Sequence, residues 1–114
     1  MRVTLLKSKL HRAVVTGASL DYAGSISLPS DLIKRAGLLE YEKVLVANVA
    51  SGARFETYVI SGCDGEVTLN GAAARLGQAG DRLIVMAWAE FDEAEAASFH
   101  PKVVLVDANN RAGD

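Results

Sequence analysis

The 114-residue sequence has one cysteine, Cys63, and only two histidines, which lie far apart in the chain. A single cysteine cannot form an internal disulfide, and this set has no spacing typical of zinc sites, so we predict no metal. No apolar run approaches the roughly 20 residues that a membrane helix needs, and no signal peptide is evident. We therefore expect a cytoplasmic protein with no membrane partner.

Neither sign of charge dominates the chain. Twelve Lys and Arg stand against fourteen Asp and Glu, a net charge of −2, and no basic run is long enough to follow a phosphate backbone. Nucleic acid is therefore excluded as an expected partner. Half of the residues are hydrophobic, which indicates one globular domain over 1–114. A chain of this size buries only roughly 60 to 70 per cent of its unfolded surface, which favours association with copies of itself.

Short apolar stretches with partial two-residue alternation predict a mainly β chain. The expected strands are 2–8, 10–18, 25–28, 43–49, 55–61, 66–69, 81–90 and 103–106, with a hairpin turn at 50–53. The expected short helices are 29–36, ended by Gly37, then 71–76 and 92–98, and a flexible tail is expected at 109–114. Many short strands with a few short helices favour a small, closed or nearly closed β-barrel.

Regular alternation along 10–18 separates its side chains into two faces. These would be Leu10, Arg12, Val14 and Thr16 on one side, and Lys9, His11, Ala13 and Val15 on the other. Lys9 and His11 are thus expected on the same side of one strand.

The dipeptide Gly24-Ser25 is the most informative motif in the chain. A Gly-Ser pair alone usually marks a turn, but three other segments accompany it. They are Lys9-Leu10-His11-Arg12, Arg54-Phe55-Glu56-Thr57-Tyr58 and Asn70-Gly71-Ala72-Ala73-Ala74-Arg75. Together with Leu20-Asp21-Tyr22-Ala23-Gly24-Ser25, they resemble the pyruvoyl-dependent aspartate 1-decarboxylase family, in the same order from Met1 to about Asn110.

The resemblance implies a self-processing enzyme with a small double-psi β-barrel fold. The chain would cleave itself between Gly24 and Ser25 into chains 1–24 and 25–114, and Ser25 would become a covalently bound pyruvoyl cofactor. That carbonyl would condense with the amine of L-aspartate and accept the electrons left by decarboxylation, giving β-alanine and CO2 for pantothenate biosynthesis. The resemblance also implies a homotetramer with active sites between neighbouring subunits, and leaves open an accessory maturation protein.

Self-cleavage requires the Gly24 carbonyl close to the Ser25 hydroxyl and a donor for the developing oxyanion. Glycine suits position 24 because it adopts backbone geometries closed to other residues. By resemblance, the Thr57 hydroxyl donates to the Gly24 carbonyl, and His11 and Tyr22 support the reaction. On composition alone, Thr57 is an ordinary β-branched strand residue and His11 a polar residue on a strand.

Turnover would use a proton donor and cations for the substrate carboxylates. Tyr58 resembles the residue that returns a proton to Cα, and a phenol is protonated at neutral pH. Arg54 lies four residues before it, so on a regular strand both face one side, roughly 13 Å apart. By resemblance Lys9 is a second pocket cation, while Thr57 and the segment Asn70, Gly71, Ala72 and Ala73 contact the substrate. Which carboxylate each cation binds stays open.

The chain also departs from the family pattern. Ser19 and Asp21 stand where Asp and His are expected, and the segment 62–67 is shortened. Two alternatives remain open: a non-catalytic β-barrel that binds or assembles, in which Gly24-Ser25 is a loop, and a pyruvoyl decarboxylase for another amino acid. Arg54 and Lys9 favour a substrate with two carboxylates.

Overall fold

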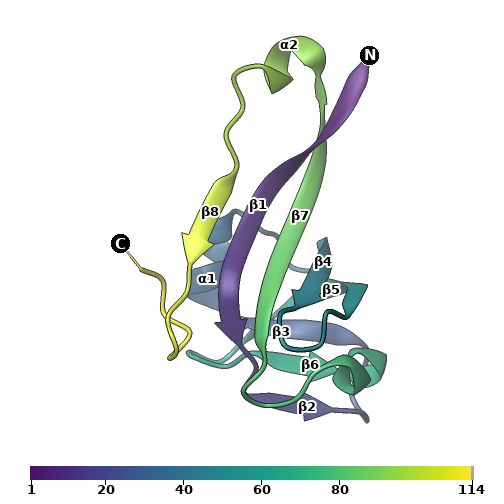
Figure 1. Ribbon diagram of the computed structural model, residues 1–114, viewed down its shortest axis with the longest axis vertical. Coiled ribbons are helices and arrows are strands. Elements are labelled where there is room, and N and C mark those ends of the chain that lie inside the picture. The colour runs from purple at the N-terminus through teal and green to yellow at the C-terminus, as the bar shows by residue number, and fades with distance from the viewer. Residues whose placement is uncertain (114) are drawn as a thin grey trace.

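A long antiparallel ribbon dominates the computed structural model, which describes residues 1–113 (Figure 1). The ribbon pairs β1 (Arg2–Val14) with β7 (Arg82–Asp92) and projects beyond the rest of the molecule, with the short helix α2 (Glu93–Ala96) at its far end. β8 (Lys102–Leu105) returns parallel to β1 along its other edge. Among the described residues, no helix is long and apolar enough to cross a membrane.

The remaining strands close a small barrel below this ribbon. They are β2 (Gly17–Ser19), β3 (Ser25–Pro29), β4 (Lys43–Asn48), β5 (Arg54–Gly62) and β6 (Thr68–Asn70). The strand order is β2-β6-β3-β5-β4-β7-β1-β8. β1 continues into β2 through Val15 and Thr16, and the Thr16 amide donates to the Val67 carbonyl just before β6. The two ends of the strand order are therefore joined, and the sheet closes on itself. The predicted mainly β fold, a small barrel with a few short helices, is confirmed.

The barrel interior is filled by aliphatic side chains from nearly every strand. Each buried Leu, Ile or Val contributes roughly 1.5–3 kcal/mol relative to exposure. The largest are Leu10, Val15, Ile26, Leu28, Leu32, Val44, Val46, Val59, Val67, Leu69, Leu83 and Val85. One continuous cluster therefore holds strands from both ends of the chain together.

The expected strands at 2–8 and 10–18 are wrong in two respects. Residues 2–14 form one strand, and its pairing with β7 shifts register between His11 and Ala13. Arg12 lies in this bulge with φ +74°, so Leu10 and Ala13 are both buried although regular alternation put them on opposite faces. The predicted faces hold before the bulge and are exchanged after it.

The helices lie close to their expected positions and are shorter or displaced at their ends. α1 (Ser30–Ala36) follows Pro29, which ends β3 instead of starting the helix, and Gly37 ends it in the left-handed conformation with φ +69°. Residues 71–76 form the 3-10 helix η1 (Gly71–Leu76). At 92–98 the helix is only Glu93–Ala96, where the Asp92 amide donates to the Glu95 carboxylate.

Of the tail expected to be flexible, the structure describes residues 109–113, and Asp114 lies outside them. Asn110 is buried, and its side chain bonds both backbone groups of Val14 and the carbonyl of Gly65 at 2.7–3.0 Å. A bridge between Val106 and Ala112 closes the same segment. The buried Asn110 amide therefore accepts one hydrogen bond and donates two, and these bonds attach this end of the chain to β1 and to Gly65.

Candidate functional site

Ser25 lies at the wall of a cavity of about 380 Å³. It is the first residue of β3 and is only 1% exposed. All three tyrosines of the sequence line this cavity, although they come from three separate segments. The complete lining is Tyr22, Ala23, Ser25, Ser27, Tyr41, Tyr58, Ile60, Glu66, Thr68 and Asn70.

The Ser25 hydroxyl is held by two hydrogen bonds. It donates to the Ala23 carbonyl at 3.3 Å and accepts from Nδ2 of Asn70 at 3.0 Å. The same Nδ2 donates to the Ser27 hydroxyl at 3.0 Å. Antiparallel pairing of β3 with β6 places Asn70 directly opposite Ser25, so the sheet itself aligns the amide with the hydroxyl. Asn70 is 3% exposed, and these bonds satisfy its buried amide.

Gly24 lines a second cavity, of about 340 Å³, and Tyr58 lines both cavities. The lining of the second is Gly24, Phe55, Glu56, Thr57, Tyr58, Ala72, Ala73 and Leu76. Five predicted site residues therefore meet here: Gly24, Thr57, Tyr58, Ala72 and Ala73. Within residues 1–113, no hydrogen bond joins the Thr57 hydroxyl to the Gly24 carbonyl. The structure brings these two residues to one cavity without the predicted contact.

The unusual backbone geometry lies at Gly71 and not at Gly24, where we expected it. Gly24 does not have a positive φ, and a Cβ built on it would meet only the Asn70 carbonyl oxygen at 3.9 Å. Gly71 has φ +64°, and a Cβ there would lie 2.7 Å from the Gly24 Cα. The glycine that this loop requires is thus the one opposite the predicted cleavage site.

Four predicted residues do not line either cavity of the single chain: Lys9, His11, Arg54 and Gly71. Lys9 and His11 lie on β1, opposite Met86 and Ile84 of β7. The Nδ1 atom of His11 is buried and has no hydrogen-bond partner within residues 1–113.

Arg54 is the third of these residues and begins β5 in an exposed position. The pairing of β4 with β5 is uninterrupted from Ala47–Arg54 to Lys43–Tyr58, so Arg54 and Tyr58 share a face as regular geometry requires. Arg54 nevertheless lies outside the cavity that Tyr58 lines.

Sequence reasoning missed six residues of the Ser25 cavity, Ala23 and Ile60 and four with polar side chains: Ser27, Tyr41, Glu66 and Thr68. Ser27 and Thr68 could have been found by alternation, because each lies two residues from a predicted site residue, Ser25 or Asn70. Tyr41 has a positive φ of +70°, and its ring centroid lies 6.3 Å from that of Tyr58. No local pattern signals that placement.

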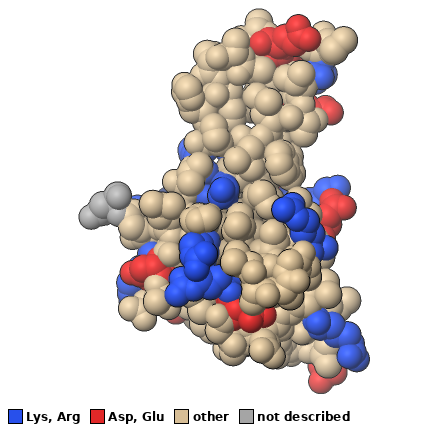
Figure 2. Space-filling model, in the orientation of Figure 1, with Lys and Arg blue, Asp and Glu red and all other residues tan. Residues whose placement is uncertain are grey.

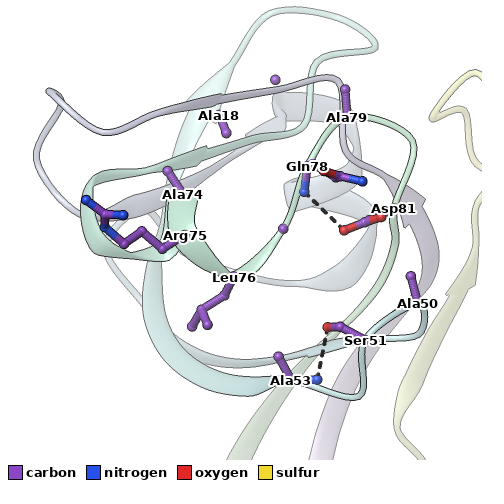
Figure 3. A pocket seen from close by; sticks show the side chains of 12 residues that line it. Ala18, Ala50, Ser51, Ala53, Ala74, Arg75, Leu76, Gln78, Ala79 and Asp81 are labelled. Atoms are coloured by element: carbon purple, nitrogen blue, oxygen red, sulfur yellow. Dashed lines mark hydrogen bonds between the residues drawn. The ribbon is translucent and has the colours of Figure 1, made fainter.

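Another cavity, of about 740 Å³, contains none of the predicted site residues. It lies between β2, the β4–β5 turn and the segment after η1, and Figure 3 shows that small side chains surround it. Its carboxylate, Asp81, accepts from Asn48 Nδ2 and the Gln78 amide at 2.9 and 3.0 Å, and the side chain of Arg75 points away from the cavity (Figure 3). The predicted catalytic residues Ser25 and Tyr58 line the smaller Ser25 cavity instead. Residues 1–113 hold no cluster of potential metal ligands.

Comparisons with known proteins agree over nearly the whole chain. The model of a family described as aspartate decarboxylase matches residues 1–113. The aspartate 1-decarboxylase of Campylobacter jejuni is 60% identical over 113 residues, which cover 98% of this chain and 90% of that protein. The proteins of the same name from Ruminiclostridium cellulolyticum and Campylobacter hominis are 51% and 47% identical, covering 97% and 98% of this chain and 88% and 98% of their own.

Proposed function

The chain belongs to the aspartate decarboxylase family, and we propose that it decarboxylates L-aspartate to β-alanine and CO2 with a pyruvoyl group made from its own Ser25. The product would supply pantothenate biosynthesis, and we place the reaction in the cytoplasm. The observation that carries the proposal is the buried Ser25 hydroxyl, held by Asn70 inside a cavity that Tyr58 also lines.

The residues around position 25 fit a carbonyl group. The Asn70 amide already donates to an oxygen of residue 25, and a carbonyl oxygen accepts such a bond equally well. Burial of Ser25 keeps bulk water from the position where the group would form. When present, the pyruvoyl carbonyl supplies the electron sink that ordinary side chains lack for loss of an α-carboxylate.

Self-cleavage begins at the Ser25 hydroxyl. Its oxygen bonds to the Gly24 carbonyl carbon as the C–N bond between the two residues breaks. Elimination then removes the Ser25 Cα proton and breaks the Ser25 Cβ–Oγ bond, so the oxygen stays on the new Gly24 carboxylate. Water hydrolyses the resulting C–N double bond of residue 25 and supplies its carbonyl oxygen, and the Ser25 nitrogen leaves as ammonia. The products are chains 1–24 and 25–114. Thr57 shares a cavity with Gly24, which supports a role for its hydroxyl at the developing oxyanion.

In turnover, Tyr58 would return a proton to the substrate Cα. Its ring lines the Ser25 cavity, and a phenol hydroxyl is a proton donor. Arg54 lies on the same strand face and would bind a substrate carboxylate, because its planar guanidinium can hold both oxygens. Asn70 would orient polar groups at the same end of the cavity.

We further propose a homotetramer in which neighbouring subunits complete each site. Lys9 and His11 lie on the β1–β7 ribbon, away from the cavities of their own chain. Tyr22 and Tyr41 line the Ser25 cavity yet are 70% and 72% exposed, so a neighbouring surface could cover them. The ribbon shows few charged side chains on the face seen in Figure 2, and large apolar residues are exposed on β7 and β8. These are Trp88, Val103 and Leu105.

Intact-mass measurement of the purified chain tests the proposal. We expect two species, residues 1–24 and 25–114, the second with its first residue converted, whereas a non-catalytic barrel gives one. Borohydride trapping with L-aspartate should add mass at residue 25 only, and glutamate or neutral analogues should compete poorly. Ser25→Ala should abolish scission and activity. A Ser25→Ala protein that still decarboxylates aspartate would refute the cofactor assignment.

Tyr58→Phe separates scission from turnover. The variant keeps the ring that packs near Tyr41 and loses only the hydroxyl, so scission should proceed as in the wild type. Loss of a positioned proton donor should lower kcat by about 10²- to 10⁴-fold. Stopped assays of β-alanine formation, corrected for the fraction of cleaved chain, measure the effect. Retention of more than a tenth of wild-type kcat would remove Tyr58 from the mechanism.

A further inference from the structure

Gly71 makes the closest approach to the backbone that precedes Ser25. A Cβ built on it would lie 2.7 Å from the Gly24 Cα, 2.8 Å from the Gly24 nitrogen and 2.9 Å from the Tyr22 carbonyl oxygen. Separations below 3.0 Å are essentially never observed for real Cβ atoms. All three neighbours are backbone atoms, so none of them can swing aside as the end of a side chain does. Position 71 therefore has room for a side chain only if the Gly24 and Tyr22 backbone moves away.

Two consecutive residues, Asn70 and Gly71, contact the two residues joined by the bond that would break, Ser25 and Gly24. Asn70 pairs with Ser25 across the β3–β6 ladder and donates to its hydroxyl. Gly71 lies against Gly24, which carries the carbonyl that the hydroxyl must reach. The geometry of attack thus depends on how closely the 70–71 backbone approaches the 24–25 backbone.

We propose that Gly71 is a positioning residue for self-cleavage. Because it has no side chain, the 70–71 backbone packs directly against Gly24 and keeps the Gly24 carbonyl beside the Ser25 hydroxyl. The inference rests on the proposed function. It assigns Gly71 a role in forming the cofactor, separate from any contact that its backbone makes with substrate afterwards.

The expected effect follows from the displacement that a methyl group would force. Moving the Gly24 Cα from 2.7 Å to an ordinary contact distance of 3.4 Å requires a shift of about 0.7 Å. A misplacement of about 1 Å costs roughly a hundredfold in reactions that depend on a near-attack geometry. Gly71→Ala should therefore slow scission between about tenfold and a hundredfold.

The chain contains a matched control for the backbone strain of this substitution. Gly52 lies in the β4–β5 turn with φ +78°, close to the +64° of Gly71, and a Cβ on it would meet nothing within 4 Å. Gly52→Ala thus places a side chain on a residue with positive φ, at the same cost in backbone strain, but without any contact with Gly24. It should be cleaved at the wild-type rate.

The experiment follows scission of wild type, Gly71→Ala and Gly52→Ala by intact mass over time. Folding is compared without scission in the double variants Ser25→Ala/Gly71→Ala and Ser25→Ala/Gly52→Ala, by circular dichroism and melting temperature. We expect both double variants to fold with the same spectrum, and only Gly71→Ala to be cleaved slowly.

Three results would overturn the positioning role. The first is cleavage of Gly71→Ala at the wild-type rate, including the case in which turnover alone falls. The second is failure of Ser25→Ala/Gly71→Ala to fold while its Gly52 counterpart folds, since Gly71 would then act only in packing. The third is equal slowing of scission in Gly52→Ala. A wild-type chain that is never cleaved would instead refute the proposed function, on which this role depends.

Discussion

Asn70→Ala should slow self-cleavage because it removes the donor that holds the Ser25 hydroxyl. In the structure, Nδ2 of Asn70 donates to Ser25 and Ser27 at 3.0 Å each. The Ser25 hydroxyl also donates to the Ala23 carbonyl, so its oxygen is free to accept from Asn70 and stays in one orientation. Alanine at position 70 leaves that oxygen without its buried partner.

The magnitude has two parts. Two lost hydrogen bonds, at about 0.5–1.5 kcal/mol each, should lower the free energy of unfolding by about 1–3 kcal/mol. For scission, a Ser25 side chain released into three staggered rotamers spends roughly a third of its time in the reactive one. If poorer alignment of the hydroxyl also raised the activation free energy by about 1 kcal/mol, the rate would fall about another fivefold. Scission should therefore slow by about three- to fifteenfold, while folding survives.

Asn48→Ala is the matched control. Asn48 is also buried, and its Nδ2 donates to the Leu76 carbonyl and the Asp81 carboxylate at 3.0 and 2.9 Å, far in sequence from Ser25. Its Oδ1 accepts from the Ala50 amide as well. Removing Asn48 should destabilise the fold at least as much as removing Asn70, with no effect on the rate of scission.

The assay measures urea unfolding of both variants in the Ser25→Ala background and scission by intact mass in the Ser25 background. We expect destabilisation in both variants and slow scission in Asn70→Ala alone. Cleavage of Asn70→Ala at or above the wild-type rate would refute the reasoning. It would mean that the donated hydrogen bond restrains the hydroxyl from attack more than it positions it.

Two further predictions concern stability. Asn110→Ala should lower the free energy of unfolding by about 1.5–4.5 kcal/mol, because it removes three hydrogen bonds to Val14 and Gly65. Urea unfolding will measure the change, and an unchanged unfolding midpoint would show that these bonds do not stabilise the fold. Asp81 has its pKa lowered below 3.8, first by the Asn48 amide, so its stabilisation is complete above 3.8 and is lost as the pH falls through the lowered value. Asp81→Asn should flatten the acid-side fall of stability in urea titrations below pH 3.8, and an unchanged slope would contradict this origin.

Much of the fold could be predicted from local patterns. The hairpin of β4 and β5, the strands β3, β7 and β8, and the turn of helix closed by Gly37 all lie within two residues of their expected positions, because alternation and glycine act over a few neighbouring residues. The family, and with it the decarboxylase function, also followed from motifs read in order along the chain. Which residues do the chemistry stays a prediction for the experiments above.

The sequence by itself determined the pair Gly24-Ser25, the motif around Tyr58 and the mainly β character, since each is written in adjacent residues. Tertiary structure alone decided that Arg12 bulges and exchanges the faces of β1, and that Tyr41 lies beside Tyr58. It also decided that the glycine packed against the predicted cleavage site is Gly71. These features depend on how closely two backbones distant in sequence approach each other, and no run of neighbouring residues encodes that distance.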